Sequence, residues 1–442
     1  MAQLPYSKRE QRGWYMYDWA NSTFATTVVT LFLGPYLTAL AKAGAGADGL
    51  IHPLGIPVDP RSWWSYLISF SVLTQVVVLP MLGTVADFSA HKKRLMGAFA
   101  WTGALATTAM FLLTGGDWLG GGILFLIANL AFGASIVVYN SFLPDIAPPE
   151  QRDAVSSRAW GIGYLGGGVL LALNLALFAK AKSLGLSEGL AVRINLASAG
   201  VWWALFTLIP LACLLDRPPG RVRKPGEGLT STFRAFAATL GEMRRYPQTL
   251  RFLLAYLIYN DAVQTVIALA AQFGSDELKI SMADLTMVIL MVQFVAFFGN
   301  ILFDWAARWM GAKAAVMVSL LIWTGVLVAM YVSVRTRTQF FAAAAVVAIV
   351  LGGTQALSRS LFAQMIPKGR EGEYFSVYEI SDKGTSWLCP LLFGLALQFT
   401  GSYRLAILSL VTFFVGGLLV LATVNVHRAA IEAGGIEAGA RG

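Results

Sequence analysis

The sequence predicts an all-α polytopic membrane protein with 12 transmembrane helices in two pseudo-symmetric six-helix bundles. Hydrophobic residues make up 57% of the chain and charged residues only 13%, whereas soluble domains carry roughly 25% charged residues. Apolar stretches long enough to cross about 30 Å of hydrocarbon recur along the whole chain, and the mean hydropathy is +0.64. Similar polar loops occur in both halves of the chain, which indicates an internal duplication.

The expected spans follow one another with short polar connections, and each is long enough to cross the membrane as a helix. They are residues 14–40, 63–87, 95–115, 119–141, 156–179, 192–215, 250–273, 284–306, 314–334, 339–364, 374–399 and 403–426. The longest polar interruption has six spans on either side. We therefore expect an N-terminal six-helix bundle at 1–215, a cytoplasmic linker at 216–248, and a C-terminal six-helix bundle with a short tail at 249–442.

The linker carries apolar residues at helical spacing over 231–245, which predicts an amphipathic helix that ends before Pro247. Such a helix either lies on the inner leaflet or packs on the bundle as a connecting element.

The basic residues are distributed unevenly between the two sides of the predicted membrane. Most of the 33 Lys and Arg residues fall in loops on the side that carries both termini, which the positive-inside rule assigns to the cytoplasm. We therefore expect a multi-pass protein of the cell inner (plasma) membrane, and we attribute the net charge of +9 to topology rather than to nucleic-acid binding. Cys213 and Cys389 fall within spans, so we expect no disulfide framework, metal site or cofactor.

A short polar loop at 83–95 separates the second and third spans. It places Asp87 at the end of one span and the bases 92–94 at the start of the next. Charges at these positions are costly unless they face water or each other. A weaker copy with Asp304 and Arg308 closes the eighth span, and compact charged turns at 146–156 and 366–376 follow spans four and ten.

Two halves of six spans, paired loops and a long central segment are typical of the major facilitator architecture, in which the halves rock about a midplane site. The loop Gly83-x-x-x-Asp87, followed by bases, resembles the signature between spans two and three of that superfamily. The chain is more specifically similar to its vacuole-effluxer branch, founded on fungal autophagy-linked vacuolar amino acid exporters with many bacterial relatives. The stretches that carry this resemblance are Tyr17-Asp-Trp-Ala-Asn-Ser22, Tyr139-Asn-Ser-Phe-Leu-Pro-Asp145, Leu257-Ile-Tyr-Asn-Asp-Ala-Val-Gln-Thr-Val266 and Gly353-Thr-Gln-Ala-Leu-Ser-Arg-Ser360. The resemblance implies a solute carrier, with amino acids among the candidate cargoes.

Span five departs from the superfamily's proton-linked drug exporters, which tend to carry a Gly-Pro pair there. It reads Gly161-Ile-Gly-Tyr-Leu-Gly-Gly-Gly168. Gly163 and Gly167 form a small-xxx-small pair, which predicts close packing of this helix on a neighbour. This departure weakens an assignment as a drug exporter.

The resemblance implies that the polar loops form a cytoplasmic gate built from Gly83, Asp87, Arg94, Asp304 and Arg308. Asp87 would face the N-terminus of span eleven, where the helix dipole favours an anion, and would pair with Arg94. Asp304 would do the same, more weakly, toward span five. These contacts would close the cytoplasmic side and break when it opens; direct contact with the solute is the alternative.

Polar residues share a helical face in each of spans one, four, seven and ten, which resemble the cavity-lining set of the superfamily. They are Asp18, Asn21 and Ser22; Asn129, Gly133 and Asn140; Asn260, Asp261 and Gln264; and Gln355, Ser358 and Arg359. At 1.5 Å per residue, Asp261 and Lys383 lie near mid-depth, and Glu379 lies about 10 Å from the inner edge. A charge at the centre of a lipid-exposed helix costs roughly 2.5–3.5 kcal/mol, so these side chains should face the interior or a cavity.

Each embedded charge has both a functional and a structural interpretation. Asp261 either takes part in coupling or amine binding, or it is a protonated acid bonded to its neighbours. Arg359 either clamps a carboxylate or neutralises Glu379 or Asp382. Glu379 and Lys383, four residues apart, either form an intrahelical salt bridge or serve as a gate or in substrate binding.

The remaining candidates are polar or aromatic. Asp18 either serves the cavity or reaches the inner interface of the membrane. Tyr256, Tyr259 and Trp387 either wall a binding site, where they could hold a quaternary ammonium, or pack in the core. The further polar candidates are Asn21, Asn140, Asn260, Gln264 and Gln355.

We therefore expect a secondary active transporter, not an enzyme, that moves a small zwitterionic or cationic organic solute by alternating access. An amino acid is the favoured cargo, and proton coupling is left open. Arg359 or Lys383 would take the carboxylate, and Asp261 the amine or a coupling proton. The alternatives are an exporter of organic cations or quaternary amines and a non-transporting membrane sensor. The expected partners are the solute, protons and the lipid bilayer, with no nucleic acid, and the protein is expected to be a monomer.

Overall fold

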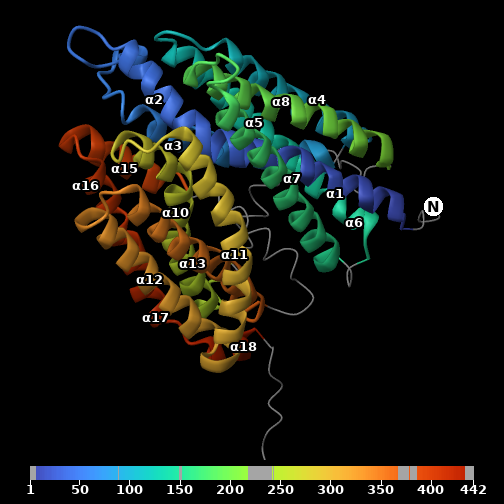
Figure 1. The fold of residues 1–442 in the computed structure, drawn as a ribbon. Helices are drawn as coiled ribbons and strands as arrows, with labels where there is room; N and C mark the ends of the chain where they lie inside the picture. The colour runs from blue at the N-terminus through green and yellow to red at the C-terminus, as the bar shows by residue number, and fades with distance from the viewer. Residues whose placement is uncertain are drawn as a thin grey trace, which may run out of the picture.

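The computed structural model describes residues 6–433, apart from 88, 149–151, 218–240, 242, 367–377 and 379–385. The described secondary structure is helical, with one isolated bridge between Ile51 and Val58. The N-terminal half contains α1 (Lys8–Thr23), η1 (Phe24–Phe32), α2 (Leu33–Ala43), η2 (Pro53–Gly55), α3 (Trp63–Asp87), α4 (Lys92–Ala109), η3 (Met110–Leu112), α5 (Trp118–Asn140), α6 (Leu143–Ile146), α7 (Arg152–Lys180) and α8 (Glu188–Cys213). The C-terminal half contains α10 (Pro247–Asp276), α11 (Met282–Met310), α12 (Ala312–Val332), α13 (Arg337–Ala363), α15 (Leu388–Thr400), α16 (Tyr403–Ser409), α17 (Val411–Ala422) and α18 (Val426–Glu432). The expected all-α membrane fold is confirmed (Figure 1).

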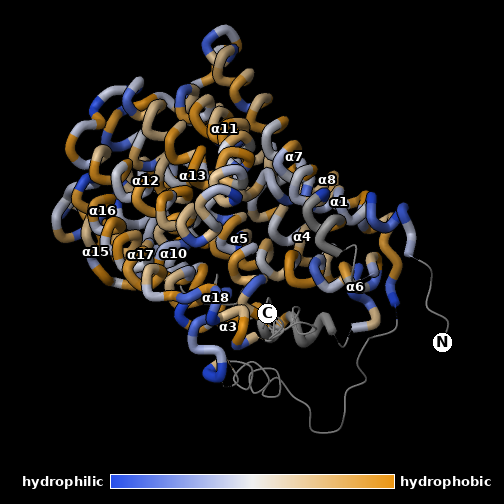
Figure 2. The backbone as a smooth tube through the Cα atoms, turned by 90° about the horizontal axis from the view of Figure 1, so that it is seen from below, coloured by the Kyte–Doolittle hydropathy of each residue, from blue (hydrophilic) through white to orange (hydrophobic). Residues whose placement is uncertain are grey.

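The spans agree with the hydropathy pattern, although their number is not fully settled by length alone. Among the described residues, 10 helices are long and apolar enough to cross a membrane. Two shorter apolar helices, Trp63–Leu79 and Leu388–Thr400, lie where the second and eleventh spans are expected. Figure 2 shows that apolar residues dominate the helices, whereas hydrophilic residues gather at their ends. The expected amphipathic helix at 231–245 falls largely outside the described residues.

Side-chain caps fix where several spans begin. Ser187 accepts a hydrogen bond from Leu190 N at the start of α8, and Ser281 accepts one from Asp284 N at the start of α11. Thr336 and Gln339 form a complete capping box at the start of α13. Each such cap satisfies backbone N–H groups that the helix itself leaves unpaired, and its loss costs about 1 kcal/mol. These loops between spans are therefore short and well defined.

The first span is longer than expected and is not a uniform α-helix. It runs without interruption over Lys8–Ala43, and its middle segment η1 is a π-helix of nine residues. A π-helix makes i→i+5 hydrogen bonds, occurs rarely, and is frequent at functional sites. Here the segment carries Thr26 and Thr30 in the centre of the membrane span.

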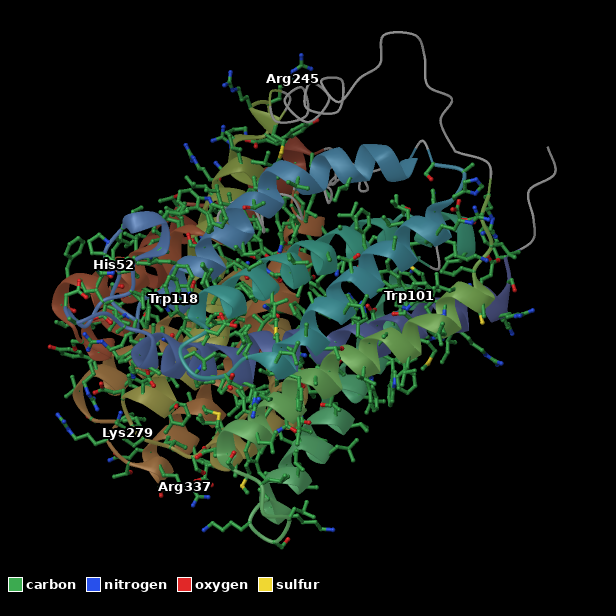
Figure 3. The ribbon with its side chains drawn as sticks, turned by 90° about the horizontal axis from the view of Figure 1, so that it is seen from above. His52, Trp101, Trp118, Arg245, Lys279 and Arg337 are labelled. Atoms are coloured by element: carbon green, nitrogen blue, oxygen red, sulfur yellow. The ribbon has the colours of Figure 1, made fainter. Side chains whose placement is uncertain are left out.

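The two halves form separate groups of helices that meet at one end and diverge toward the end where α1 begins (Figure 1). At the meeting end α2 packs on α10, and α3 packs on α15. His52, Lys279 and Arg337, labelled in Figure 3, lie in or beside the loops of this end. We call it the closed end, because the hydrogen bonds that join the halves through described side chains are found there.

Close packing between α1 and α7 accounts for the glycines of span five. A Cβ at Gly163 would lie 2.6 Å from Ser22 Oγ, and a Cβ at Gly166 would lie 2.5 Å from the Trp19 carbonyl oxygen. A Cβ at Gly161, in contrast, would meet nothing within 4 Å. The small residues therefore let α7 approach α1 directly, as the small-xxx-small pattern predicts.

Candidate functional site

A pocket of about 300 Å³ lies between the two halves and extends into the C-terminal one. The N-terminal half contributes Thr26 and Thr30 from η1 and Trp160 and Tyr164 from α7. The remaining wall comes from C-terminal helices α10, α11, α12, α13, α15 and α16. A pocket of this size, mostly apolar and with a few polar groups, has the character of a small-molecule site.

The apolar part of the pocket lies toward the closed end. Leu285, Met330 and Phe340 line it near the ends of α11, α12 and α13 that face the closed end. The lining of α13 continues from Phe340 to Gln355, about 22 Å along the helix at 1.5 Å per residue. The pocket therefore passes from an apolar end to a more polar region near the middle of the membrane.

Three glutamines provide amide groups in this more polar region. Gln264 comes from α10, Gln293 from α11 and Gln355 from α13. The sequence pattern identified Gln264 and Gln355 as candidates, but it did not identify Gln293. The available signal was helical spacing, since Asn300 and Asp304 lie seven and eleven residues after Gln293 and share its helical face.

Asp261 lies one turn from Gln264 but is buried between helices, with 1% of its surface exposed. Its Oδ2 accepts a hydrogen bond of 3.0 Å from the backbone N–H of Cys389, in the first turn of α15. The N-terminus of a helix favours negative charge, and the Asp261 side chain lies against such an end. Asp261 therefore connects the seventh span to the start of α15.

The aromatic candidates beside Asp261 are packed in the core. The Tyr259 hydroxyl lies 2.6 Å from Ser358 Oγ and its residue is 1% exposed. Tyr256 stacks on Tyr378, with ring centroids 4.3 Å apart, and Asn260 is 2% exposed. The Tyr259 contact connects α10 to α13, and both contacts support the packing interpretation of the two tyrosines.

The candidates of the N-terminal half are engaged within that half. Asp18 Oδ2 accepts a hydrogen bond of 3.0 Å from the Tyr139 hydroxyl. The Tyr139 ring stacks on Trp14, with centroids 4.3 Å apart. Asn21 is buried, whereas Asn140, the last residue of α5, is exposed. Asp18 thus lies on the α1–α5 contact rather than in the pocket.

Arg359 is exposed and lies one turn beyond Gln355 on α13, toward the end where α1 begins. Trp387 is half-buried, and its carbonyl accepts a hydrogen bond of 2.7 Å from Ser69 Oγ of α3. Glu379, Asp382 and Lys383 lie outside the described residues. Among the described residues, no group of three or more His, Cys, Asp and Glu side chains could hold a metal ion.

The polar loop after α3 is held by partners that the sequence did not indicate. Lys92 Nζ lies 3.4 Å from Asp145 Oδ2, and Lys93 N donates a hydrogen bond of 2.8 Å to Asp216 Oδ1. Arg94 is exposed. These contacts connect the start of α4 to α6 and to the segment that follows α8, within the N-terminal half.

The expected cytoplasmic gate is only partly covered by the structure. Gly83 belongs to α3, and Arg308 is exposed near the end of α11. The side chains of Asp87 and Asp304 lie outside the described part, so the gate stays a prediction.

A polar network joins the two halves at the closed end. Gln272 of α10 is fully buried, and its Nε2 lies 2.8 Å from Thr38 Oγ1, 2.8 Å from the Arg61 carbonyl and 3.2 Å from the Tyr403 hydroxyl. Asp276 Oδ2 lies 3.1 Å from Lys42 Nζ. Further bonds run from Asp59 N to Gln398 and from Ser62 Oγ to the Gly394 carbonyl. The Asp59 carboxylate, which accepts hydrogen bonds from the Arg61 guanidinium, raises the pKa of Arg61.

Two helical bundles in a membrane, joined at one end and with a pocket between them, define a membrane transporter of the major facilitator type. The model of the vacuole effluxer Atg22-like family matches residues 6–434, and the chain belongs to this family. An uncharacterized MFS-type transporter of Bacillus subtilis, YxiO, is 30% identical over 94% of this chain and 95% of its own length. Autophagy-related protein 22 of Pyricularia oryzae is 26% identical over 90% of this chain and 74% of its own length.

Solved transporter structures share the fold. An inward-facing, unoccupied bacterial homolog of the human lysosomal transporter Spinster aligns with a TM-score of 0.67 at 16% identity, over 98% of this chain and 99% of that chain. An inward-facing bacterial homologue of the iron transporter ferroportin aligns with a TM-score of 0.66 at 14% identity, over 96% of this chain and 99% of that chain. The protein is therefore a multi-pass membrane transporter of the major facilitator fold.

Proposed function

We propose that the protein is a secondary active transporter of the cell inner membrane that moves a small zwitterionic or cationic organic solute by alternating access. An amino acid is the favoured cargo. The observation that carries this proposal is a pocket lined by both halves, which are hydrogen-bonded to each other at one end. Rocking of the halves about such a pocket would expose a bound solute to each side in turn.

Two charged residues of the C-terminal half, Arg359 and Asp261, would bind the carboxylate of the solute and a coupling proton. Arg359 lies one turn from the pocket residue Gln355 and could bind a carboxylate in two hydrogen bonds. Asp261 would take a coupling proton, because protonation would weaken its attraction to the N-terminus of α15. With both termini cytoplasmic, as the basic residues indicate, the closed end is the outer one.

Transport into proteoliposomes tests this proposal. Reconstituted protein would be assayed with a panel of labelled amino acids and amines, with and without a pH gradient. We expect accumulation of at least one zwitterionic or cationic solute above protein-free vesicles, and dependence on the gradient if protons are coupled. If no member of the panel is moved and none shifts thermal stability, the assignment of the cargo class is wrong.

An exporter of organic cations is the second candidate, and one observation favours it. Trp160 and Tyr164 line the pocket, with ring centroids 6.2 Å apart. A cation within about 6 Å of such rings is attracted by about 0.5–2 kcal/mol. Quaternary amines in the same panel distinguish the two candidates, since a quaternary amine lacks the carboxylate that Arg359 would bind.

A further inference from the structure

We propose that the pocket recognises an uncharged amide group of its solute through Gln264, Gln293 and Gln355. The apolar body of the solute would then occupy the part of the pocket near the closed end. This inference rests on the proposed function in taking the pocket as the site of the transported solute. It adds the class of group that the site selects, which is a carboxamide or a peptide group.

The first support is that these three amides make no side-chain hydrogen bond within the part of the chain that the structure describes, although they lie within spans. Two other glutamines in spans have partners for their amide nitrogens. Gln272 Nε2 lies within hydrogen-bonding distance of three oxygens, and Gln75 Nε2 donates to the Asn129 carbonyl at 3.0 Å. Gln264, Gln293 and Gln355 are half-buried beside the pocket, and a solute that displaces water from them must replace its hydrogen bonds. Three such amides around one pocket therefore indicate a ligand that bonds to them.

The second support comes from the hydroxyls on the opposite wall. Thr26 Oγ1 donates its hydrogen to the Ser22 carbonyl at 2.9 Å, and Thr30 Oγ1 donates to the Ala25 carbonyl at 2.9 Å. Each hydroxyl carries a single hydrogen, so both can offer a ligand only acceptor lone pairs. The N-terminal wall thus requires a donor on the solute, whereas the glutamines can both donate and accept.

An amide meets both requirements without a charge. Its N–H can donate to a threonine or to a glutamine oxygen, and its carbonyl can accept from a glutamine NH₂ group. An ester or a ketone of the same shape offers no donor. A carboxylate offers no donor either, and it is better matched by the guanidinium of Arg359, one turn away.

The volume limits the size of the solute. At about 30 Å³ per water, a pocket of 300 Å³ corresponds to roughly ten water volumes. Part of this volume is enclosed by Leu285, Met330 and Phe340. The site thus suits a solute of roughly ten non-hydrogen atoms with a short apolar body and an amide, which is about the size of a small dipeptide.

The test uses the purified full chain and probes of similar size that each carry a short alkyl chain. Pentanamide, methyl butanoate, pentanoate and pentylamine would be compared by the shift of the thermal unfolding midpoint as a function of probe concentration. We expect pentanamide to bind about tenfold more tightly than methyl butanoate, as one or two hydrogen bonds predict. Equal or tighter binding of the ester, the carboxylate or the amine overturns the inference, and this comparison needs no variant.

Variants locate the effect in the three glutamines. Gln264→Leu, Gln293→Leu and Gln355→Leu should each weaken pentanamide binding about two- to twelvefold and leave methyl butanoate binding within about twofold. Gln364→Leu is the matched control, since Gln364 is an exposed residue at the end of α13 outside the pocket. Unchanged pentanamide binding in all three folded variants contradicts the assignment.

The outcome also separates this inference from the proposed function. Amide preference without transport of any amino acid or amine would retain the site and reject the transport class. Transport by a protein that does not prefer the amide would retain the transport class and reject the amide site.

Discussion

The polar network at the closed end allows the equilibrium between conformations to be shifted by a single substitution. Gln272 is fully buried and contacts Thr38 and the Arg61 carbonyl of one half and Tyr403 of the other. Its NH₂ group has two hydrogens, so it makes at most two of these hydrogen bonds at once. Each hydrogen bond contributes about 0.5–1.5 kcal/mol, so Gln272→Leu removes about 1–3 kcal/mol of stabilising free energy. Because the contacts to Thr38 and Arg61 join the halves, the substitution destabilises the closed arrangement. The equilibrium constant between the closed and open arrangements should then shift roughly five- to 150-fold toward the open one.

Spin labels on opposite halves measure this shift. Ile56 and Arg335 are exposed in loops of the closed end, one in each half, and would carry the labels as cysteines in a background without Cys213 and Cys389. We expect a narrow distance distribution in the parent protein and an additional longer component in Gln272→Leu. The matched control is Gln75→Leu, because Gln75 is also buried but donates to Asn129 within the N-terminal half. It should lower stability without adding the longer component, and an unchanged distribution in Gln272→Leu refutes the reasoning.

Three further predictions concern single contacts. Glu10 is 2% exposed and binds Arg217 through two hydrogen bonds of 2.9 Å. Glu10→Ala should therefore lower the free energy of unfolding by about 3–5 kcal/mol, because it leaves a buried charge unpaired. In denaturant titrations the double variant with Arg217→Ala should lose less, and an equal or larger loss would argue against the pair. Gly163→Val should overpack α7 against Ser22 and lower the free energy of unfolding by about 1–3 kcal/mol. Gly161→Val should leave the thermal midpoint nearly unchanged. Similar midpoints for the two variants would exclude close packing as the cause. Asp261→Asn should abolish gradient-driven accumulation in proteoliposomes and spare exchange. The substitution removes the attraction between the carboxylate and the N-terminus of α15, which is worth about 0.3–2 kcal/mol. Unchanged accumulation would exclude Asp261 as the coupling acid.

The fold could be predicted from the sequence because the membrane imposes a simple requirement on each span. Every backbone polar group must be satisfied within the segment, so apolar stretches of sufficient length become helices. The first span was predicted at 14–40 and runs over Lys8–Ala43. The helix begins earlier because its first turns, from Lys8, are polar, and hydropathy identifies only the apolar part of a helix. Its π-helical segment packs against α8 and α10, and hydropathy reports neither these contacts nor the type of helix.

The site was predicted less completely, because it depends on contacts distant in sequence. Helical spacing identified Gln264 and Gln355, which both line the pocket. The same reasoning could not place Asp261 against Cys389, since these residues are 128 positions apart. Nor could it assign Lys92 to Asp145 rather than to an acid of its own loop. Gln293 was missed, although it shares a helical face with Asn300 and Asp304.

The glutamines of the spans explain how a solute could act on the same equilibrium as the network at the closed end. The Gln272 amide nitrogen lies within hydrogen-bonding distance of oxygens of both halves and stabilises their closed arrangement. Gln264, Gln293 and Gln355 belong to one half, and the threonines that face them across the pocket belong to the other. A solute that bonds to both walls favours the arrangement in which both walls are within reach. A ligand shifts a conformational equilibrium only by its differential affinity for the two states. The hydrogen bonds of the solute to Thr26 and Thr30 would therefore stabilise the closed arrangement together with the hydrogen bonds of Gln272. When the solute is released, its bonds to the threonines are lost, and the halves could then separate at the closed end.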